Sequence, residues 1–451
     1  MKENVVILGA GESGTGAALL AMSKGKQVFV SDKGSIVRKY KSELLSANIE
    51  FEEDGHSLDR ILAADLVIKS PGIPEDIELI QQLRAASIPV IDELEFASRY
   101  TNKPIIAITG SNGKTTTTLL THHLLSKNGV NAALVGNVGN SMARQVIDDD
   151  ADLYVAEVSS FQLDGMYQFS ADTAVILNIT PDHLDRYNYD FERYADSKMR
   201  ILQGMQAANM LVYCSTDAYL DRRVAEITAP IVKIAIGLEP TEENSGYVES
   251  DNLVYDKSVE RIQIPLKELP LRGPHNYLNT LVAIAVAAHY GLNEAQIRHA
   301  LPSFKNAPHR LELVTSINGV EVINDSKATN VEAVQYALGS FSRPIIWIAG
   351  GQDKGNDYSS LKQLVAQKVK AMICLGVDND TLLAEFGSIV PAVSETQDVK
   401  EAAEMALEYA NASDVVLFSP ACASFDLFNN YAERGELFKE AVLQLKEEID
   451  A

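Results

Sequence analysis

A β-branched run near residue 105 passes into a glycine-bearing turn and then into a predicted helix. It reads Ile105-Ile-Ala-Ile-Thr-Gly-Ser-Asn-Gly-Lys-Thr-Thr-Thr-Thr118. Such a turn points several backbone N–H groups and a helix N-terminus at one spot, which favours phosphate binding. In this arrangement Lys114 reaches the β- and γ-phosphates of a nucleotide, and the Thr115 hydroxyl binds Mg²⁺. These residues predict binding of a nucleoside triphosphate.

The turn is a variant of the common G-x-x-x-x-G-K-[ST] form. The position five residues before Gly113 is Ile108, and the other glycine of the turn is Gly110. The residues expected around the triphosphate are Gly110, Ser111, Asn112, Gly113, Lys114, Thr115 and Thr116.

Two further predicted strands end in side chains suited to a metal ion. Leu153–Ala156 is followed by Glu157, and Ala174–Leu177 leads to His183. An acid at the end of a strand beside a phosphate loop can hold or orient Mg²⁺. Glu157 is therefore a candidate metal ligand, whereas His183 taken alone could equally be a structural residue.

A second glycine-rich turn, Gly9-Ala-Gly11-Glu-Ser-Gly14, lies near the N-terminus. Asp32 ends the next predicted strand 18 residues after Gly14. Taken alone, this is the dinucleotide fingerprint, with glycines for the turn and an acid for a ribose hydroxyl. Because the chain has a second, better nucleotide site, we interpret this turn as a cradle for a different diphosphate.

Length and composition limit the class of protein. The 451 residues are too many for one core and suggest about three domains. No apolar run approaches the ~20 residues that cross a bilayer. The few, widely spaced cysteines (Cys214, Cys374 and Cys422) fit a reducing cytoplasm. The net charge of −23 argues against nucleic acid or an anionic membrane as partner.

The alternation of apolar strands and helical stretches predicts an α/β protein of three domains. Residues 1–93 form a Rossmann-like domain, whose buried parallel strands are Val5–Leu8, Gln27–Ser31, Asp65–Lys69 and Pro89–Ile91. Residues 94–304 carry the phosphate loop and form a central P-loop ATPase-like domain. Residues 305–451 begin with a hairpin at Asn318-Gly319, which is typical of a type I′ turn, and form a second Rossmann-like domain.

The apolar strands predicted in the last domain include Pro344–Ala349, Ala371–Leu375 and Val415–Phe418. Polar clusters follow the ends of three strands there. They are Asn324-Asp-Ser-Lys-Ala-Thr-Asn330, Gly350-Gly-Gln-Asp-Lys-Gly355 and Ser419-Pro-Ala-Cys-Ala-Ser-Phe425. In open parallel sheets, ligands bind beyond the carboxyl ends of the strands. We therefore expect a second binding site at this edge of the last domain.

Over its full length, the chain resembles the Mur ligase family of peptidoglycan synthesis. The matching features are the phosphate loop, Glu157-Val-Ser-Ser-Phe-Gln162, His275-Asn-Tyr-Leu-Asn279 and Pro308-His-Arg310. The segments Asn324–Asn330 and Ser419–Ser424 are similar to the branch of the family that adds D-glutamate.

The resemblance implies an ATP-dependent amide ligase of cell-wall synthesis. In that reaction, the γ-phosphoryl group of ATP activates the carboxylate of UDP-N-acetylmuramoyl-L-alanine as an acyl phosphate. The amine of D-glutamate then attacks, and ADP and phosphate leave. The implied cofactors are ATP, two Mg²⁺ ions and a CO₂-derived carbamate on Lys198 that holds the second ion. The implied partners are these small molecules, and we expect a cytoplasmic monomer.

The resemblance also assigns residue roles. The catalytic residues are Lys114, Glu157, His183 and Lys198, and the metal ligands are Thr115, Glu157, His183 and Lys198. Further ATP contacts come from His275, Asn276, Asn279, Arg310 and Asp325. The UDP end of the substrate meets Glu12, Ser13, Asp32, Lys33, Gly72 and Asn137. D-Glutamate meets Lys327, Thr329, Lys354, Ser424, Phe425 and Tyr431.

The chain departs from the family pattern after Asp32. The family has Thr-Arg there, whereas this chain has Lys33-Gly34. Lys33 can supply positive charge but not the planar, bidentate fork of an arginine.

Three alternatives stay open from the sequence. A NAD-dependent dehydrogenase that uses Gly9–Gly14 leaves the phosphate loop and the last domain without a role. A different Mur-type ligase or a folylpolyglutamate synthase shares the central domain, although the latter typically lacks a first domain like residues 1–93. A non-catalytic ATP-binding regulator needs fewer charged groups than this chain carries.

Overall fold

The structure is a computed structural model that describes residues 2–257 and 259–450. The chain forms two compact units, one of Met1–Pro270 with Tyr277–Phe304 and one of Leu271–Asn276 with Lys305–Ala451. The first unit contains two sheets and the second unit contains one. All three sheets are largely parallel and are covered by helices, which confirms the predicted α/β class.

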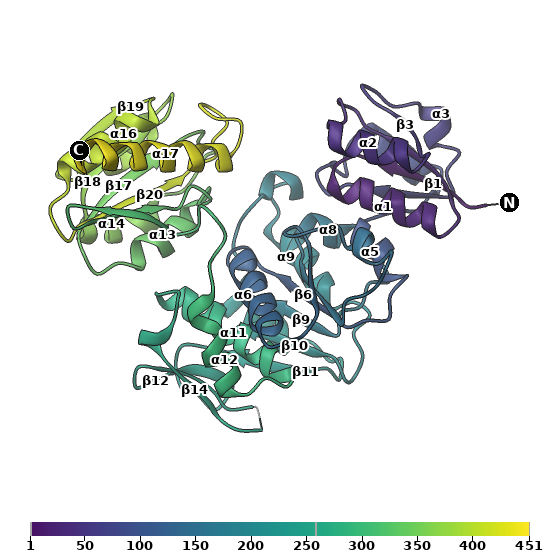
Figure 1. Ribbon diagram of the computed structural model, residues 1–451, viewed down its shortest axis with the longest axis horizontal. Helices are drawn as coiled ribbons and strands as arrows, with labels where there is room; N and C mark the ends of the chain where they lie inside the picture. Colours follow the sequence, from purple (N-terminus) through teal and green to yellow (C-terminus); the bar gives the residue numbers. More distant parts are fainter. Residues whose placement is uncertain (1, 258, 451) are drawn as a thin grey trace. The chain divides into compact units, whose positions relative to one another are not determined.

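The first sheet lies in the N-terminal part of unit one (purple in Figure 1). Its five strands are parallel, in the order β3-β2-β1-β4-β5: Glu50–Glu52, Gln27–Ser31, Asn4–Leu8, Leu66–Lys69 and Val90–Ile91. Val5 and Ile7 pack on one face with α1 (Glu12–Ser23) and α2 (Arg38–Ser46). Val6 and Leu8 pack on the other face with α3 (Leu58–Ile61) and α4 (Glu78–Ala85). Burial on both faces explains why these strands read as continuous apolar runs.

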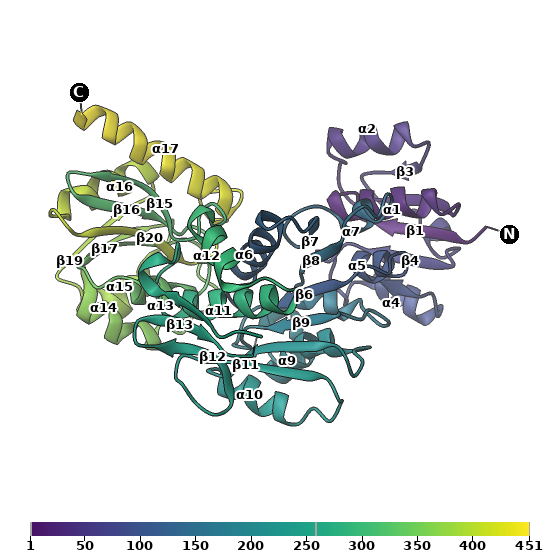
Figure 2. The ribbon, with the colours of Figure 1, turned by 60° about the horizontal axis from the view of Figure 1, so that its bottom comes forward.

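The second sheet also belongs to unit one and has nine strands, in the order β14-β13-β12-β11-β10-β9-β6-β8-β7. Their bounds are Ile262–Pro265, Asn252–Tyr255, Asn244–Glu249, Val232–Ile236, Met210–Cys214, Thr173–Ile176, Ile105–Thr109, Leu153–Glu157 and Ala132–Gly136. Figure 2 shows β7, β8, β6 and β9 side by side. The helices are α6 (Lys114–Lys127), α7 (Met142–Gln145), α8 (Ser160–Asp164), α9 (Phe191–Met199), α10 (Ala218–Ala225), α11 (Pro274–His289) and α12 (Glu294–Ala300).

A short helix, α5 (Glu93–Ser98), joins the two sheets of unit one. The side chain of Glu95 is fully buried, and its Oε2 accepts the backbone N–H groups of Tyr167, Gln168 and Phe169 at 3.2, 3.0 and 2.7 Å. Its Oε1 accepts from Arg99 Nη2 at 2.7 Å. Since a buried carboxylate is stable only with such partners, Glu95 fixes α5 to the segment Tyr167–Phe169.

The sheet of unit two has the order β15-β16-β20-β17-β18-β19: Glu312–Ile317, Val320–Asn324, Val415–Ala421, Ile345–Gly350, Val369–Leu375 and Ala392–Thr396. Helices α13 (Val331–Gly339), α14 (Lys362–Lys368) and α15 (Asp380–Phe386) pack on one face. Helices α16 (Val399–Tyr409) and α17 (Tyr431–Asp450) pack on the other, with α17 beside β15 and β16 (Figure 2).

The predicted hairpin at residues 318 and 319 is confirmed. β15 and β16 pair antiparallel, and Asn318 and Gly319 both have positive φ angles, of 50° and 82°. Positive φ at both central residues is what a type I′ turn requires.

Candidate active site

Strand order brings the predicted phosphate loop and its candidate metal ligands to one edge of the nine-stranded sheet. β6, which ends at the loop, lies between β8 and β9. All three strands are parallel, and Ile108 near the end of β6 pairs with Glu157 at the end of β8. The loops after these strands therefore meet at the same edge, where open parallel sheets bind ligands.

The phosphate loop is shaped by its glycines and by Asn178. Gly113 has φ +83°, and a Cβ atom there would come within 2.6 Å of Asn279 Oδ1, so the position requires glycine. Asn178 Oδ1 accepts the backbone N–H of Asn112 at 2.8 Å. Lys114 begins α6, and its Nζ donates to the carbonyls of Gly110 and Ser111 at 2.7 and 2.8 Å. Asn279 is buried and contacts Thr117 at 3.2 Å, so the predicted ATP residue Asn279 lies at this loop.

Lys198 lies under the same loop. Its Nζ donates to the Gly110 carbonyl at 2.8 Å, so Lys114 and Lys198 share one acceptor. Lys198 is 2% exposed, and burial, together with the charge of Lys114, holds its pKa well below the usual lysine value. Sequence reasoning identified Lys198 only through the family resemblance, because a single lysine in a helix carries no signal of burial.

Tyr194, one turn before Lys198 on α9, was missed from the sequence. Its hydroxyl lies 2.8 Å from Ser111 Oγ, and the Lys198 ammonium lies 4.7 Å from the centre of its ring. Ser111 Oγ also donates to the Thr180 carbonyl at 2.8 Å. Tyr194 therefore connects the phosphate loop to the helix that carries Lys198.

Glu157 fits the role of a metal ligand. It is buried, its Oε1 accepts from Asn137 Nδ2 at 2.8 Å, and its Oε2 is buried without a hydrogen-bond partner among the described residues. A buried carboxylate oxygen without a donor is costly unless a cation approaches it. Thr115 is also buried. Across residues 2–257 and 259–450, no three His, Cys, Asp or Glu side chains form a metal-binding group by themselves.

His183 lies on the loop after β9 and is exposed. Its ring contacts Phe161 with centroids 5.3 Å apart, and its Nε2 lies 3.7 Å from Asp182 Oδ2. Three residues later, Arg186 lies over the Phe161 ring at 4.2 Å and donates to the carbonyl of Gly72 at 3.2 Å. Arg186 was missed from the sequence, although it brings the predicted UDP residue Gly72 to the loop that carries His183.

The glycine-rich turn after β1 is tied to the loop after β2 by Asp32. Its two carboxylate oxygens accept the backbone N–H groups of Ala10 and Gly34, at 2.7 and 2.9 Å. The carboxylate thus holds the two loops together. Lys33 is exposed beside it and Ser13 is half-buried on α1.

The side chain of Glu93 on α5 binds the first residues of α7. Its Oε1 accepts from Ser141 Oγ at 2.7 Å and from the Ala143 N–H at 2.6 Å, and no described residue bonds to its buried Oε2. Burial raises the pKa of Glu93 to about 7, although the bonds from Ala143 and Ser141 oppose the shift.

This shift predicts a pH-dependent stability. A carboxyl with a raised folded-state pKa contributes stability that is complete below about pH 4.5 and is lost as pH rises through 7. Glu93→Gln removes this titration. Because the unsubstituted protein loses this stability as pH rises, we expect the free energy of unfolding of Glu93→Gln to increase, relative to that of the unsubstituted protein, by about 3 kcal/mol between pH 4.5 and 8, measured by chemical denaturation. Glu50→Gln, on an exposed glutamate, is the control; a Glu93→Gln difference that is flat with pH would contradict the prediction.

The predicted amino-acid loops of unit two lie at the ends of three adjacent strands, β16, β20 and β17. The loops after β17 and β20 are joined by backbone hydrogen bonds between Gln352 and Ala423, of 2.8 and 3.2 Å. Lys327 Nζ lies 5.1 Å from the centre of the Tyr431 ring, and Ser424 is buried. Of the other residues predicted there, Thr329, Lys354 and Phe425 are exposed.

A buried arginine that the sequence did not reveal holds two of these loops. Arg434 on α17 is 1% exposed and donates to Ser326 Oγ and the Ser326 carbonyl at 3.0 and 2.8 Å. It also donates to the Cys422 carbonyl at 3.2 Å. Burial lowers the pKa of Arg434 to about 10, which leaves it charged at neutral pH. A guanidinium with this set of acceptors fixes the backbone beside Lys327 and Ser424.

Four further residues predicted at ATP belong to unit two. The His275 ring contacts Tyr336 at 5.1 Å, and burial lowers the pKa of His275 to about 4. Asn276 is buried and donates to the Arg272 carbonyl at 2.9 Å. Asp325 accepts from Ser419 Oγ at 2.8 Å and from the Leu311 N–H at 3.1 Å, and burial raises its pKa to about 7. Arg310 is half-buried.

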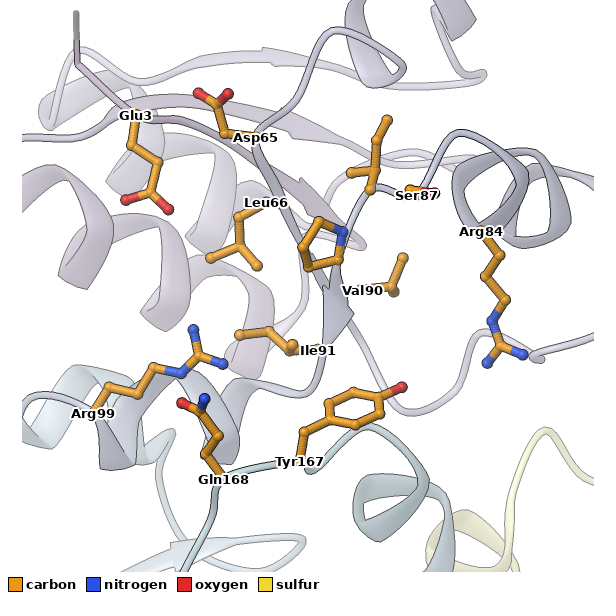
Figure 3. A pocket seen from close by; sticks show the side chains of 12 residues that line it. Glu3, Asp65, Leu66, Arg84, Ser87, Val90, Ile91, Arg99, Tyr167 and Gln168 are labelled. Carbon is orange, nitrogen blue, oxygen red and sulfur yellow. The ribbon is translucent and has the colours of Figure 1, made fainter.

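A pocket of about 570 Å³ lies elsewhere in unit one (Figure 3). Glu3 and Asp65, which precede β1 and β4, place it at the amino ends of the first sheet, opposite the turn at Gly9. Its arginines, Arg84 and Arg99, pair with Glu75 and Glu95 respectively. The pocket is thus separate from both the phosphate loop and the diphosphate cradle.

Three family profiles match the chain. They are the MurD N-terminal domain over residues 4–79, the Mur ligase middle domain over 108–287, and the Mur ligase glutamate ligase domain over 309–422. The predicted borders at 93/94 and 304/305 lie between these matches, and they remain predictions. Among the described residues, no helix is long and apolar enough to span a membrane.

Curated relatives extend the match to the full length. UDP-N-acetylmuramoylalanine–D-glutamate ligases of Cytophaga hutchinsonii and Christiangramia forsetii are each 46% identical, over 99% of this chain and 100% of theirs. The MurF ligase of Thermotoga maritima, solved in complex with ADP, shares the fold, with a TM-score of 0.60, 17% identity, and coverage of 95% of this chain and 99% of that one. The chain belongs to the Mur ligase family, in the group of its UDP-N-acetylmuramoylalanine–D-glutamate ligases.

Proposed function

We propose that the protein uses ATP to join D-glutamate to the carboxylate of UDP-N-acetylmuramoyl-L-alanine, releasing ADP and phosphate. The observation that carries this proposal is the convergence of Lys114 and Lys198 on the Gly110 carbonyl, in the loop beside Glu157. A cationic lysine, a buried second lysine and an acid at a phosphate loop suit phosphoryl transfer, in which the protein mainly positions groups and neutralises charge. The names of the full-length relatives supply the two substrates.

The two units would hold different substrates. In unit one, Lys114 and residues Gly110–Thr116 would hold the triphosphate, and the cradle of the first sheet would hold the diphosphate of the UDP substrate. In unit two, Lys327, Lys354 and Ser424 would hold the carboxylates of D-glutamate. Each of these sites lies at the carboxyl ends of parallel strands, as open α/β sheets require.

The donor set beside the loop fits magnesium. Thr115 and Glu157 would hold one Mg²⁺ ion, and His183 and a carbamate on Lys198 would hold a second. Mg²⁺ would supply charge neutralisation for the transferred phosphoryl group. The orphaned Oε2 of Glu157 supports this assignment. A carbamate forms when an unprotonated amine attacks CO₂ and a proton leaves. The burial of Lys198 suits that chemistry, and the resulting negative charge would be paired with the metal.

The test is phosphate release from ATP with Mg²⁺ and UDP-N-acetylmuramoyl-L-alanine, screened across amino acids. Turnover with D-glutamate and not with L-glutamate is the expected result, with the dipeptide product identified by mass. Equal rates with both enantiomers, or no rate with either, would refute the proposal. We also propose that the protein acts as a monomer in the cytoplasm; sedimentation velocity and cell fractionation test these two points.

A further inference from the structure

The glycine-rich turn that we propose as the diphosphate cradle contains an acidic residue. The negative charge of this residue is unfavourable beside a diphosphate. Glu12 is the first residue of α1 and directly follows Gly11 of the glycine-rich turn. The first turn of a helix attracts anions through its N–H groups and its dipole. A free carboxylate at this point would compete for the same N–H groups and would repel a diphosphate.

Arg144 on α7, a helix of the central domain, pairs with the Glu12 carboxylate. Its Nε donates to Glu12 Oε1 at 3.1 Å, and the same oxygen accepts the Ser141 N–H at 3.3 Å. Arg144 Nη1 lies 2.7 Å from Glu43 Oε2 on α2. All three side chains are about a quarter exposed, whereas Lys39, 3.7 Å from Glu12 Oε2, is largely exposed. Arg144 is therefore the best-shielded cation beside Glu12.

The helix that carries Arg144 is held firmly against α1. Glu93 bonds to Ser141 Oγ and to the Ala143 N–H at the start of α7. Gly16 of α1 packs so closely on α7 that an added Cβ atom would lie 2.0 Å from Ser141 Oγ. The position of Arg144 relative to Glu12 is thus fixed by packing on both sides, which makes an ion pair more effective than a mobile surface pair.

We propose that Arg144 is a positioning residue for the UDP substrate: it draws the Glu12 carboxylate toward α7 and away from the diphosphate. The first-turn N–H groups of α1 then remain available to the phosphates. Because Arg144 is already paired with two carboxylates, it acts through Glu12 and does not bind the substrate itself. This inference rests on the proposed diphosphate site of the preceding section.

The test is the affinity of the purified full chain for UDP-N-acetylmuramoyl-L-alanine, measured by calorimetry, together with steady-state kinetics. Arg144→Met should weaken binding and raise KM for this substrate by roughly 10-fold, equivalent to about 1.4 kcal/mol. We expect kcat and the affinity for ATP to change by less than about twofold, because the phosphate loop is not touched. Arg144→Lys, which keeps the charge, should restore most of the affinity.

A second substitution separates repulsion from a merely structural role. In Arg144→Met/Glu12→Gln, the charge that Arg144 restrains is gone, while the backbone N–H of residue 12, through which Glu12 would meet the UDP substrate, is kept. Affinity should therefore return to within about twofold of the unsubstituted protein. Arg60→Met, on an arginine that is paired with Glu50 in the first domain, is the matched control, with unchanged affinity expected.

Each contrary outcome has a distinct meaning. Unchanged affinity in Arg144→Met would overturn the inference. Weakened affinity that Glu12→Gln does not rescue would also overturn it, because Arg144 would then bind the substrate directly or only support the fold. Failure of the unsubstituted protein to bind the UDP substrate would refute the proposed function instead.

Discussion

Lys114→Ala is expected to lower kcat for D-glutamate ligation by roughly 1,000-fold or more, with little change in stability. A cation on the transferring phosphoryl group stabilises charge that develops in the transition state, and removing one such group typically costs that much. Lys114 begins α6 and is half-buried, and its Nζ bonds to two carbonyls of the phosphate loop. Its loss should therefore spare the core while removing charge from the site.

The measurement is single-turnover and steady-state phosphate release at saturating ATP. Lys127→Ala is the matched control, because Lys127 lies exposed in the last turn of the same helix and should leave kcat unchanged. A Lys114→Ala enzyme that keeps more than about a tenth of its kcat would show that phosphoryl transfer does not depend on this lysine.

Lys198→Ala is expected to lose most activity and to regain part of it with added short carboxylic acids. If a carbamate on Lys198 is a metal ligand, the truncated side chain leaves space beside Gly110 into which a free carboxylate can enter. Rescue should follow the size of the acid, with formate or acetate more effective than bulky acids. The measurement is phosphate release as a function of acid concentration.

Lys114→Ala is the control for this experiment, since no free acid can replace a lost cation, and its rate should stay low at every acid concentration. An independent readout is a ¹³C resonance from the unsubstituted protein in labelled bicarbonate that is missing in Lys198→Ala. Absence of both rescue and resonance would leave Lys198 as an ordinary buried amine.

The elements that sequence patterns predict well are those buried on both faces. β1, β2, β17 and β20 are continuous apolar runs, and each was located within about two residues except at the C-terminal end of β20, which runs on to Ala421. Two of the strands that were not predicted have weaker patterns: β7 reads Ala-Ala-Leu-Val-Gly, and β12 contains Asn, Ser and Gly. The strand state of β7 comes from pairing with β8, which a short local window does not contain. β12 pairs with β13 directly after it, but its Asn, Ser and Gly are depleted in strands.

Some residues of the candidate site could be predicted from the sequence, and others could not. The phosphate loop and Glu157 follow from local motifs, because phosphate and magnesium binding require glycines, a lysine and an acid at strand ends. Tyr194, Arg144 and Arg434 each stand alone in a helical stretch. Their importance comes from tertiary packing that buries a polar group and gives it one set of partners. The role of such residues can be recognised only when the tertiary packing of the helices on the sheets is known.

Helix α5 limits where the chain could be spliced if the first domain of this ligase were exchanged for that of a relative. Glu93 and Glu95 follow directly after the last strand of the first sheet, yet their acceptor oxygens serve backbone N–H groups at Ala143 and Tyr167–Phe169. An exchange of the first domain that is spliced after residue 93 would separate Glu93 from Glu95 and from its donors at Ser141 and Ala143, whereas Glu95 would stay with its own donors. A chimera would instead need the donor segments around 141–144 and 167–169 to travel with residues 1–98, as one transplantable piece.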